Sequence, residues 1–329
     1  MRRLRQTIVY LAIGLILEGG RIAVRLLPRR FFLILSAACA DLGFYLFHGF
    51  RKRSSANLSI ALGDRLDRAE ISAIVRSSLR NFFRDFIEIG FALEGSPEQI
   101  RREMPVCGSE HLEAALARGK GVIALSAHLG NFFLAGTRLA AEGYSTHILV
   151  HQPRNRKVAQ LLDRYRLEGG QKTIPARPRN QASRELARVL RRNEVAVVIA
   201  DEYRSGSGIQ VPFFARTVIA RRGPATLALR TGAALVPVCL LRQPSGTLML
   251  RIEPEIELVR TGNTQRDVGE NTLRITEWVE RTVRSHPDQW NWMTVHWQDG
   301  PRGASAEKSA DAKAWDTHPP KPIRQAETK

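Results

Sequence analysis

The chain has 329 residues, of which 43% are hydrophobic and 25% charged, a composition typical of a globular protein with a full core. Its net charge of +18 favours anionic partners, such as nucleic acid, anionic lipid or an acidic protein. The three cysteines, Cys39, Cys107 and Cys239, lie far apart, which excludes a disulfide framework and a cysteine-based metal site.

The amino terminus combines apolar runs with arginines. A basic flank precedes the apolar run 8–17, which is too short to span a bilayer comfortably. Arg21 and Arg25 then share one helix face, and Pro28 ends that helix. A second apolar stretch, 31–47, ends at the basic residues 51–53. This pattern predicts two helices lying in a membrane interface with their arginines on anionic lipid; the alternative is an amphipathic pair that packs on the protein's own core.

The rest of the chain predicts an α/β fold. Residues 55–105 are expected to be helical, because apolar residues recur at helical intervals. Strands are then expected at 122–125, 147–150, 195–200, 235–241 and 248–252. Helices are expected at 109–117, 131–141, 155–168, 181–192, 223–231 and 269–285. The alternation predicts a central, mostly parallel sheet flanked by helices and preceded by membrane-associated amino-terminal helices.

These elements suggest three parts of the chain. Residues 1–53 are expected to form the membrane-associated helices, and residues 54–299 the α/β domain. Residues 300–329 hold almost no large apolar side chain and are expected to be a disordered tail.

One histidine occupies the position where open α/β sheets place their chemistry. His128 follows the apolar run 122–125, and Gly130-Asn131 after it permits a tight turn into the next helix. An imidazole titrates near neutrality, so His128 is a candidate general base. The alternative is a histidine that only caps the helix.

A second polar stretch follows the strand predicted at 195–200. Asp201 and Glu202 are expected at the same sheet edge as His128, where a carboxylate could orient the imidazole. Arg204 begins a glycine-containing loop suited to holding phosphate. The alternatives are a turn cap for Asp201 and a solvated basic loop for the arginines. No serine-nucleophile elbow, phosphate-binding glycine loop or metal-ligand spacing appears in a suitable context.

Several short motifs resemble those of one known family in the same order. They are Ala-His128-Leu-Gly-Asn131-Phe, Ala-Asp201-Glu, Val-Pro212-Phe-Phe214-Ala-Arg, Thr-Gly232-Ala-Ala-Leu-Val-Pro237-Val and Pro287-Asp-Gln289-Trp290-Asn-Trp292. Over residues 1–298 the chain, including the stretch around Asn57, is similar to the lipid A biosynthesis (lauroyl/myristoyl) acyltransferases of the lysophospholipid acyltransferase superfamily.

The resemblance implies an enzyme at the cytoplasmic face of the bacterial inner membrane. It would move a fatty acyl group from acyl carrier protein or acyl-CoA to a hydroxyl of a lipid A-like glycolipid, with His128 as general base and Asp201 as its carboxylate. Asn131 would lie near the reacting centre, and Arg166 and Arg204 would bind phosphate of the substrates. No cofactor, metal ion or nucleic acid is expected. The amino-terminal apolar segments and Phe213-Phe214 would admit the acyl chain.

The chain departs from the family at one position. The family motif H-x4-D/E predicts a carboxylate where this chain has Phe133, and a phenyl ring cannot accept the imidazole N–H. Asp201 or Glu202 could replace the carboxylate, or a backbone carbonyl could orient the ring. Alternatively, the protein is a catalytically silent homologue that binds lipid or carrier protein without turnover.

Overall fold

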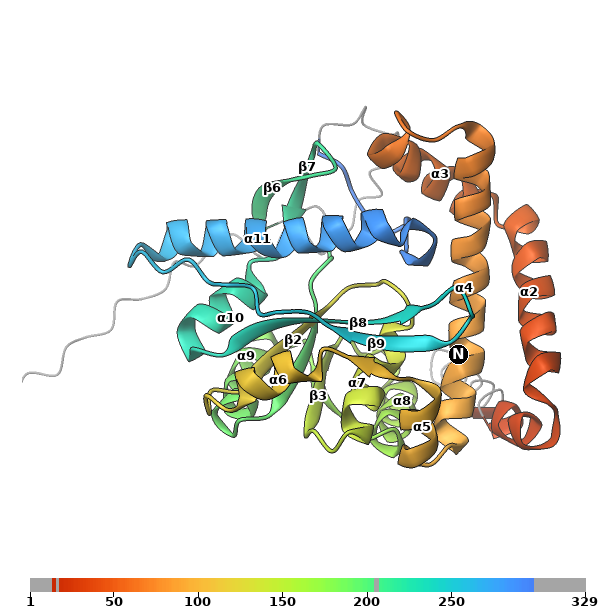
Figure 1. Cartoon of the computed structure of the whole chain (residues 1–329), viewed down its shortest axis with the longest axis horizontal. Helices are drawn as coiled ribbons and strands as arrows, with labels where there is room; N and C mark the ends of the chain where they lie inside the picture. Colours follow the sequence, from red (N-terminus) through yellow and green to blue (C-terminus); the bar gives the residue numbers. More distant parts are fainter. Residues whose placement is uncertain (1–13, 16–17, 204–206, 299–329) are drawn as a thin grey trace, which may run out of the picture.

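The computed structural model describes residues 14–15, 18–203 and 207–298, and its centre is a seven-stranded sheet (Figure 1). The strand order is β1-β9-β8-β2-β5-β3-β4, and every pair is parallel except β8 with β9. The predicted mostly parallel sheet is therefore confirmed. The strands are β1 (Val106–Cys107), β2 (Val122–Ser126), β3 (Thr146–Val150), β4 (Gln171–Pro175), β5 (Val195–Ile199), β8 (Ala234–Arg242) and β9 (Leu248–Ile252).

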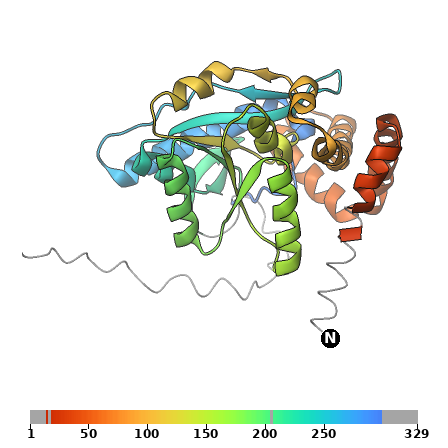
Figure 2. The same cartoon turned by 90° about the horizontal axis from the view of Figure 1, so that it is seen from below.

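Helices cover both faces of the sheet (Figures 1 and 2). Apolar side chains of α5, α6 and α7 pack with the strands in one core cluster, and those of α9, α10 and α11 pack in the other. Because helices cover both faces of the sheet, all five residues of β2 are buried. Such a strand appears in the sequence as a continuous apolar run. The helices are α5 (Pro97–Glu103), α6 (Ser109–Leu116), α7 (Phe132–Ala141), α8 (Arg156–Glu168), α9 (Arg179–Arg191), α10 (Gly223–Thr231) and α11 (Thr264–Ser285).

Four strands lie outside the predicted set. The strand β1 has only two residues, which is too short to give a pattern. The strand β4 lies at an edge of the sheet, and its polar and apolar residues do not alternate. The strands β6 (Ile209–Phe213) and β7 (Arg216–Ala220) form a separate antiparallel hairpin. Its turn residues Phe214 and Ala215 both have positive φ, and neither is the glycine or asparagine that usually announces such a turn.

The amino-terminal part forms a helical layer beside the sheet. Residues 18–26 are helical and are followed by α2 (Arg29–Leu46), α3 (His48–Leu62) and α4 (Arg68–Glu94). Figure 1 shows α2 running along α4, which begins at the capping box formed by Asp67 and Glu70. The division predicted after residue 53 falls inside α3, without a break in the helix, and remains a prediction. The expected tail lies outside the described residues.

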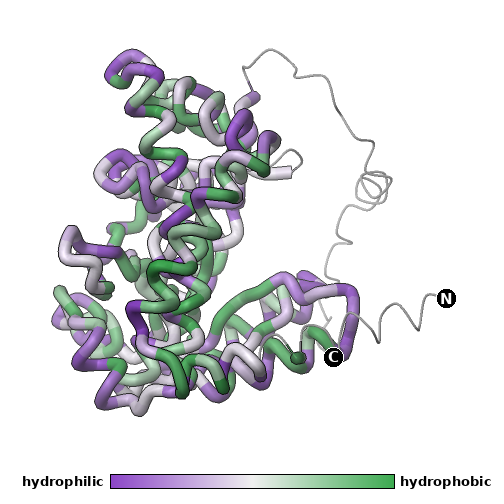
Figure 3. The backbone as a smooth tube through the Cα atoms, turned by 90° about the vertical axis from the view of Figure 1, so that its right-hand side faces the viewer, coloured by the Kyte–Doolittle hydropathy of each residue, from purple (hydrophilic) through white to green (hydrophobic). Residues whose placement is uncertain are grey.

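The outer face of α2 is apolar. Phe32, Ala40 and Phe44 of α2 are buried against the protein, whereas Ile34 and Leu46 are 72% and 63% exposed. Long apolar stretches run along the helices that face the viewer in Figure 3. Among the described residues, no individual helix has the length and apolar character to cross a membrane, and only the sharply bent pair α2–α3 meets that test jointly.

The two arginines predicted to point toward lipid instead bind α4. The Arg21 guanidinium forms an ion pair with Glu94 at 2.5 Å, and Arg25 contacts the same carboxylate. The prediction differs because the sequence does not show that Glu94, about seventy positions later, lies beside the helix that carries these arginines. The exposed side chains of α2 are mainly aliphatic and aromatic, whereas α3 and α4 also expose charged side chains such as Lys52 and Arg68.

Candidate active site

The turn after β2 presents His128. Gly130 has φ of +58°, and a Cβ there would lie 2.2 Å from the Leu240 carbonyl oxygen, so this turn needs glycine. The segment around Trp290 holds the turn from the other side. The Gly130 N–H donates to the Gln289 carbonyl, and the Asn291 N–H donates to the His128 carbonyl.

Sheet register brings Asp201 to His128. The parallel strands β2 and β5 pair Ser126 with Ile199, so the residues two positions further along each strand lie side by side. The His128 Nδ1 lies 2.8 Å from Asp201 Oδ1, and the His128 backbone N–H donates to Asp201 Oδ2 at 2.8 Å. The structure thus places together two residues that are 73 positions apart in the chain.

The carboxylate of Asp201 is completely buried and surrounded by donors. Trp290 Nε1–H donates to its Oδ2 at 2.7 Å, in addition to the two groups of His128. Burial by itself would raise the pKa of Asp201, but the charge of the His128 imidazolium and these hydrogen bonds hold that pKa below its usual value. An ionised carboxylate only accepts, so Nδ1 carries the proton and Nε2 is the basic nitrogen. The imidazole is 23% exposed, which leaves it within reach of a substrate.

Phe133 belongs to an aromatic cluster rather than to the hydrogen bonds of His128. Its ring stacks on Phe132 at 4.1 Å between centroids and lies 5.7 Å from Phe86 of α4. Phe132 in turn meets the His128 ring edge-on at 4.9 Å. An apolar aromatic run therefore connects α4 with the imidazole, while Asp201 contacts the Nδ1 atom that the family motif would assign to a carboxylate at position 133.

Asn131 lies in a buried ionic network beneath the turn. Its side-chain amide donates to Glu88 Oε2 at 3.1 Å, and Asn131 itself is fully buried. The Arg242 guanidinium, at the end of β8, donates to Glu88 Oε1 at 2.5 Å and to Asp85 Oδ1 at 2.8 Å. Burial raises the pKa of Asp85 to about 8, against the opposing charge of Arg242. Asn131 thus ties the histidine turn to α4.

Asn57 connects α3 to the tryptophan segment. Its side-chain amide donates to the Trp292 carbonyl at 2.7 Å, and its oxygen accepts from Trp297 Nε1 at 2.9 Å. The motif around Asn57 was apparent in the sequence, but its partner was not, because the two segments are more than two hundred residues apart. Trp290, Arg242 and Glu88 are further residues of the site for which the sequence assigned no role.

The roles predicted for the remaining residues stay predictions. The Arg166 guanidinium pairs with Asp163 on its own helix at 2.9 Å, and Arg204 lies outside the described residues. Glu202 approaches Arg221 and His151 at 3.7 Å each, so it faces away from the His128 contact.

Phe213 and Phe214 are buried and cannot admit an acyl chain. Phe213 packs against Trp290 and Phe214 against Trp292. The prediction for this pair was wrong because the hairpin turns both rings into the core. Among the described residues, no group of three or more histidine, cysteine or acidic side chains has the geometry to hold a metal ion.

Comparison with known sequences decides the family. The pattern of the bacterial lipid A biosynthesis acyltransferases matches residues 1–299. The chain belongs to this family.

The similar proteins found are named acyltransferases. The chain is 26% identical over 282 residues to a phosphatidylinositol mannoside acyltransferase of Mycobacterium tuberculosis, covering 85% of this chain and 86% of the relative. It is 26% identical over 226 residues to the corresponding enzyme of Mycolicibacterium smegmatis, covering 68% and 72% of the two chains. It is 23% identical over 241 residues to the lipid A biosynthesis palmitoleoyltransferase of Escherichia coli, covering 72% and 75%. This protein is therefore an acyltransferase, as the motifs predicted.

Proposed function

We propose that this acyltransferase is membrane-associated and transfers a fatty acyl group from a thioester donor to a hydroxyl of a glycolipid. The acceptor class is suggested by the relatives, which are named for lipid A and for phosphatidylinositol mannoside. The donor is acyl carrier protein or acyl-CoA. The observation that carries the proposal is the 2.8 Å contact between His128 Nδ1 and the buried Asp201 carboxylate.

The contact supports a base-catalysed mechanism. Asp201 keeps the proton on Nδ1, so Nε2 of His128 accepts the proton of the acceptor hydroxyl. The oxygen then attacks the thioester carbonyl, the carbon–sulfur bond breaks, and the imidazolium returns the proton to the departing thiolate. Asp201 stabilises the transient imidazolium and orients the ring, which makes it the carboxylate partner of His128.

The amino-terminal layer supports a membrane location. Leu26, Ile34, Leu42 and Leu46 are each at least 60% exposed, which is unusual for large aliphatic side chains in one helical layer. We place this surface in the interface of the bacterial inner membrane, at the cytoplasmic face, where both a thioester donor and a lipid acceptor are accessible. The aromatic run from Phe86 to Phe132 lies between this layer and His128 and would guide the acyl chain.

The competing hypothesis is a catalytically silent homologue, for which Phe133 is the evidence. An acyl-transfer assay in detergent, with labelled acyl-CoA or acyl carrier protein and a panel of phosphorylated glycolipids, separates the two. Transfer by the wild type that disappears in His128→Ala supports the enzyme. Phe133→Glu is expected to give no gain, since Nδ1 already has its carboxylate. A large gain from a near-zero baseline would instead identify a decayed site.

A further inference from the structure

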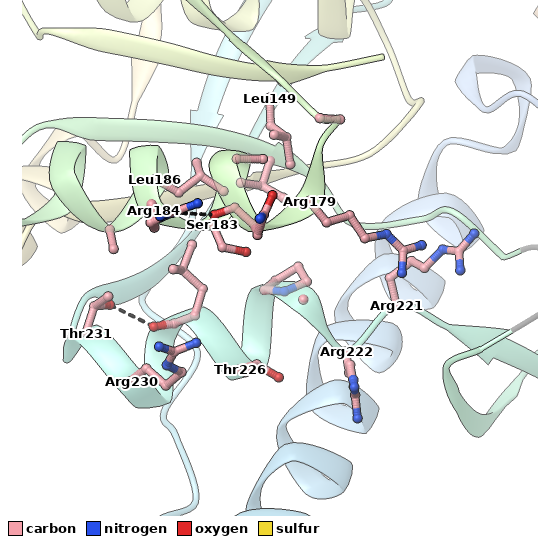
Figure 4. Close-up of a pocket in the computed structure, with 18 of the residues that line it drawn as sticks. Leu149, Arg179, Ser183, Arg184, Leu186, Arg221, Arg222, Thr226, Arg230 and Thr231 are labelled. Atoms are coloured by element: carbon pink, nitrogen blue, oxygen red, sulfur yellow. Dashed lines mark hydrogen bonds between the residues drawn. The ribbon is translucent and has the colours of Figure 1, made fainter. Parts of the chain in front are cut away.

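A cavity of about 960 Å³ lies between α9, α10 and the ends of β3 and β5 (Figure 4). Leu149 of β3 and Val198 of β5 form part of its wall. Glu202, the residue directly after Asp201, also lines it, whereas His128 and Asp201 do not. The proposed mechanism does not use this space.

The cavity is strongly basic. Eight arginines line it, and Glu202 is the one carboxylate among the described lining residues. Figure 4 shows Arg230 toward one end of the cavity and Arg221 and Arg222 toward the other. Arg222 and Arg230 are exposed and form no ion pair within the described part of the chain. Arg188 and Arg221 have the carboxylate partners Glu185 and Glu202, so the remaining positive charge of the wall favours a ligand with several negative charges.

The start of α10 adds the backbone N–H of Gly223 to the same space, whereas Pro224 has no N–H to donate. Gly223 and Pro224 line the cavity, and the helix begins without a side-chain cap. No atom lies within 4 Å of the position that a Cβ of Gly223 would take, so a ligand can approach the backbone there. The positive end of a helix and adjacent guanidinium groups both favour phosphate.

Part of the wall is apolar. Leu186 and Leu227 join Leu149 and Val198 in lining the cavity. Aliphatic side chains next to a cluster of arginines suit a ligand with a flat ring system and several phosphate groups, as in a phosphorylated nucleotide.

We propose that this cavity binds the 3′-phosphoadenosine diphosphate end of a coenzyme A thioester, with the phosphates on the arginines and the adenine on the apolar wall. The inference rests on the proposed function, because it identifies the acyl donor. Coenzyme A carries three phosphate groups, whereas a phosphodiester of a lipid headgroup or of a carrier-linked pantetheine carries one. Glu202 of the cavity wall directly follows Asp201 in the chain, so this proposal requires the pantetheine arm to pass from the arginines around Glu202 to reach His128.

The test is calorimetric titration of the full-length protein in detergent with coenzyme A, adenosine 3′,5′-bisphosphate and inorganic phosphate. The variant Arg222→Ser/Arg230→Ser should bind coenzyme A about tenfold more weakly or worse, since it loses two charged donors. The matched control Arg266→Ser/Arg281→Ser removes the same charge from exposed positions of α11 and should bind as the wild type does. Adenosine bisphosphate should compete with coenzyme A far better than inorganic phosphate.

Transfer kinetics provide the second readout. The cavity variant should raise the KM for acyl-CoA with little change in kcat, and leave the KM for acyl carrier protein unaltered. Equal weakening in the control variant, competition by phosphate as effective as by the bisphosphate, or a raised KM for carrier protein alone would each overturn the proposal. His128→Ala should still bind coenzyme A, so binding without any transfer would refute the proposed function while leaving this site intact.

Discussion

Replacing Asp201 by asparagine tests how the carboxylate orients His128. The side chain of Asp201 accepts three hydrogen bonds: from Nδ1 of His128 on Oδ1, and from the His128 N–H and Trp290 Nε1–H on Oδ2. An asparagine has one oxygen and one amide nitrogen in these two places, so one side must change from accepting to donating.

The structure decides which way the amide turns. With its nitrogen toward Trp290, Asp201→Asn would leave two buried donors unpaired, at a cost of roughly 1–3 kcal/mol each. With its amide nitrogen toward His128 Nδ1, only that hydrogen bond must reverse, because the oxygen still accepts from Trp290 and from the His128 backbone N–H. The imidazole can then accept at Nδ1 by moving its proton to Nε2. The second arrangement is favoured, and it blocks Nε2 as a base.

We therefore expect kcat to fall by about 10⁴-fold, as when the orienting carboxylate of a catalytic triad is neutralised. That factor corresponds to about 5 kcal/mol of transition-state stabilisation. KM should change little, because Asp201 is fully buried and does not contact substrate. Initial rates with labelled acyl donor measure both quantities, and thermal unfolding of the same preparation confirms that the variant is folded. A folded Asp201→Asn protein within about tenfold of wild-type kcat would refute the reasoning, provided that His128→Ala is inactive.

Three further predictions concern the groups around this pair. Trp290→Phe keeps an aromatic ring, although a smaller one, and removes the Nε1–H donor to Asp201. The kcat should fall roughly ten- to a hundredfold, for a charged hydrogen bond of about 1.5–3 kcal/mol; an unchanged rate would show that Trp290 only fills space. Arg242→Leu removes the guanidinium that pairs with Asp85 and with Glu88, which keeps Arg84 as a cationic partner, and should lower the free energy of unfolding by about 3–5 kcal/mol in urea titrations. The pKa of Asp85 is raised from 3.8 to about 8, so the folded protein holds a proton that the unfolded chain releases, and stability should fall as pH rises between these values. Asp85→Asn should flatten that slope, by at most about 1.4 kcal/mol per pH unit, and a slope identical to the wild type would contradict the assignment.

Much of the fold was predictable from local pattern. Buried parallel strands are continuous apolar runs, and helices carry a 3.6-residue period, so β2, β5 and α10 were found at nearly their observed bounds. The hairpin β6–β7 was missed because its turn uses Phe214 and Ala215 at positive φ. A residue that adopts this conformation only in the folded protein leaves no local signal.

The sequence likewise predicted only part of the candidate site. His128 and Asp201 were identified because each follows a strand of a parallel sheet, and the ends of such strands meet at one edge. The partners that hold them were not identified, since Trp290, Glu88 and Arg242 come from other layers, and sequence periodicity contains no information on which layers meet.

The sequence by itself determined the fold class, the family and the two residues of the proposed catalytic pair, because these depend on local hydrophobic periodicity and on short motifs. Only the tertiary structure decided that Asp201 contacts Nδ1 of His128, that Phe133 joins an aromatic cluster, and that Arg21 and Arg25 bind Glu94. Each of these contacts joins distant segments or depends on the direction of a side chain. Such contacts are set by sheet register and by the packing of whole layers, which no local stretch of sequence specifies.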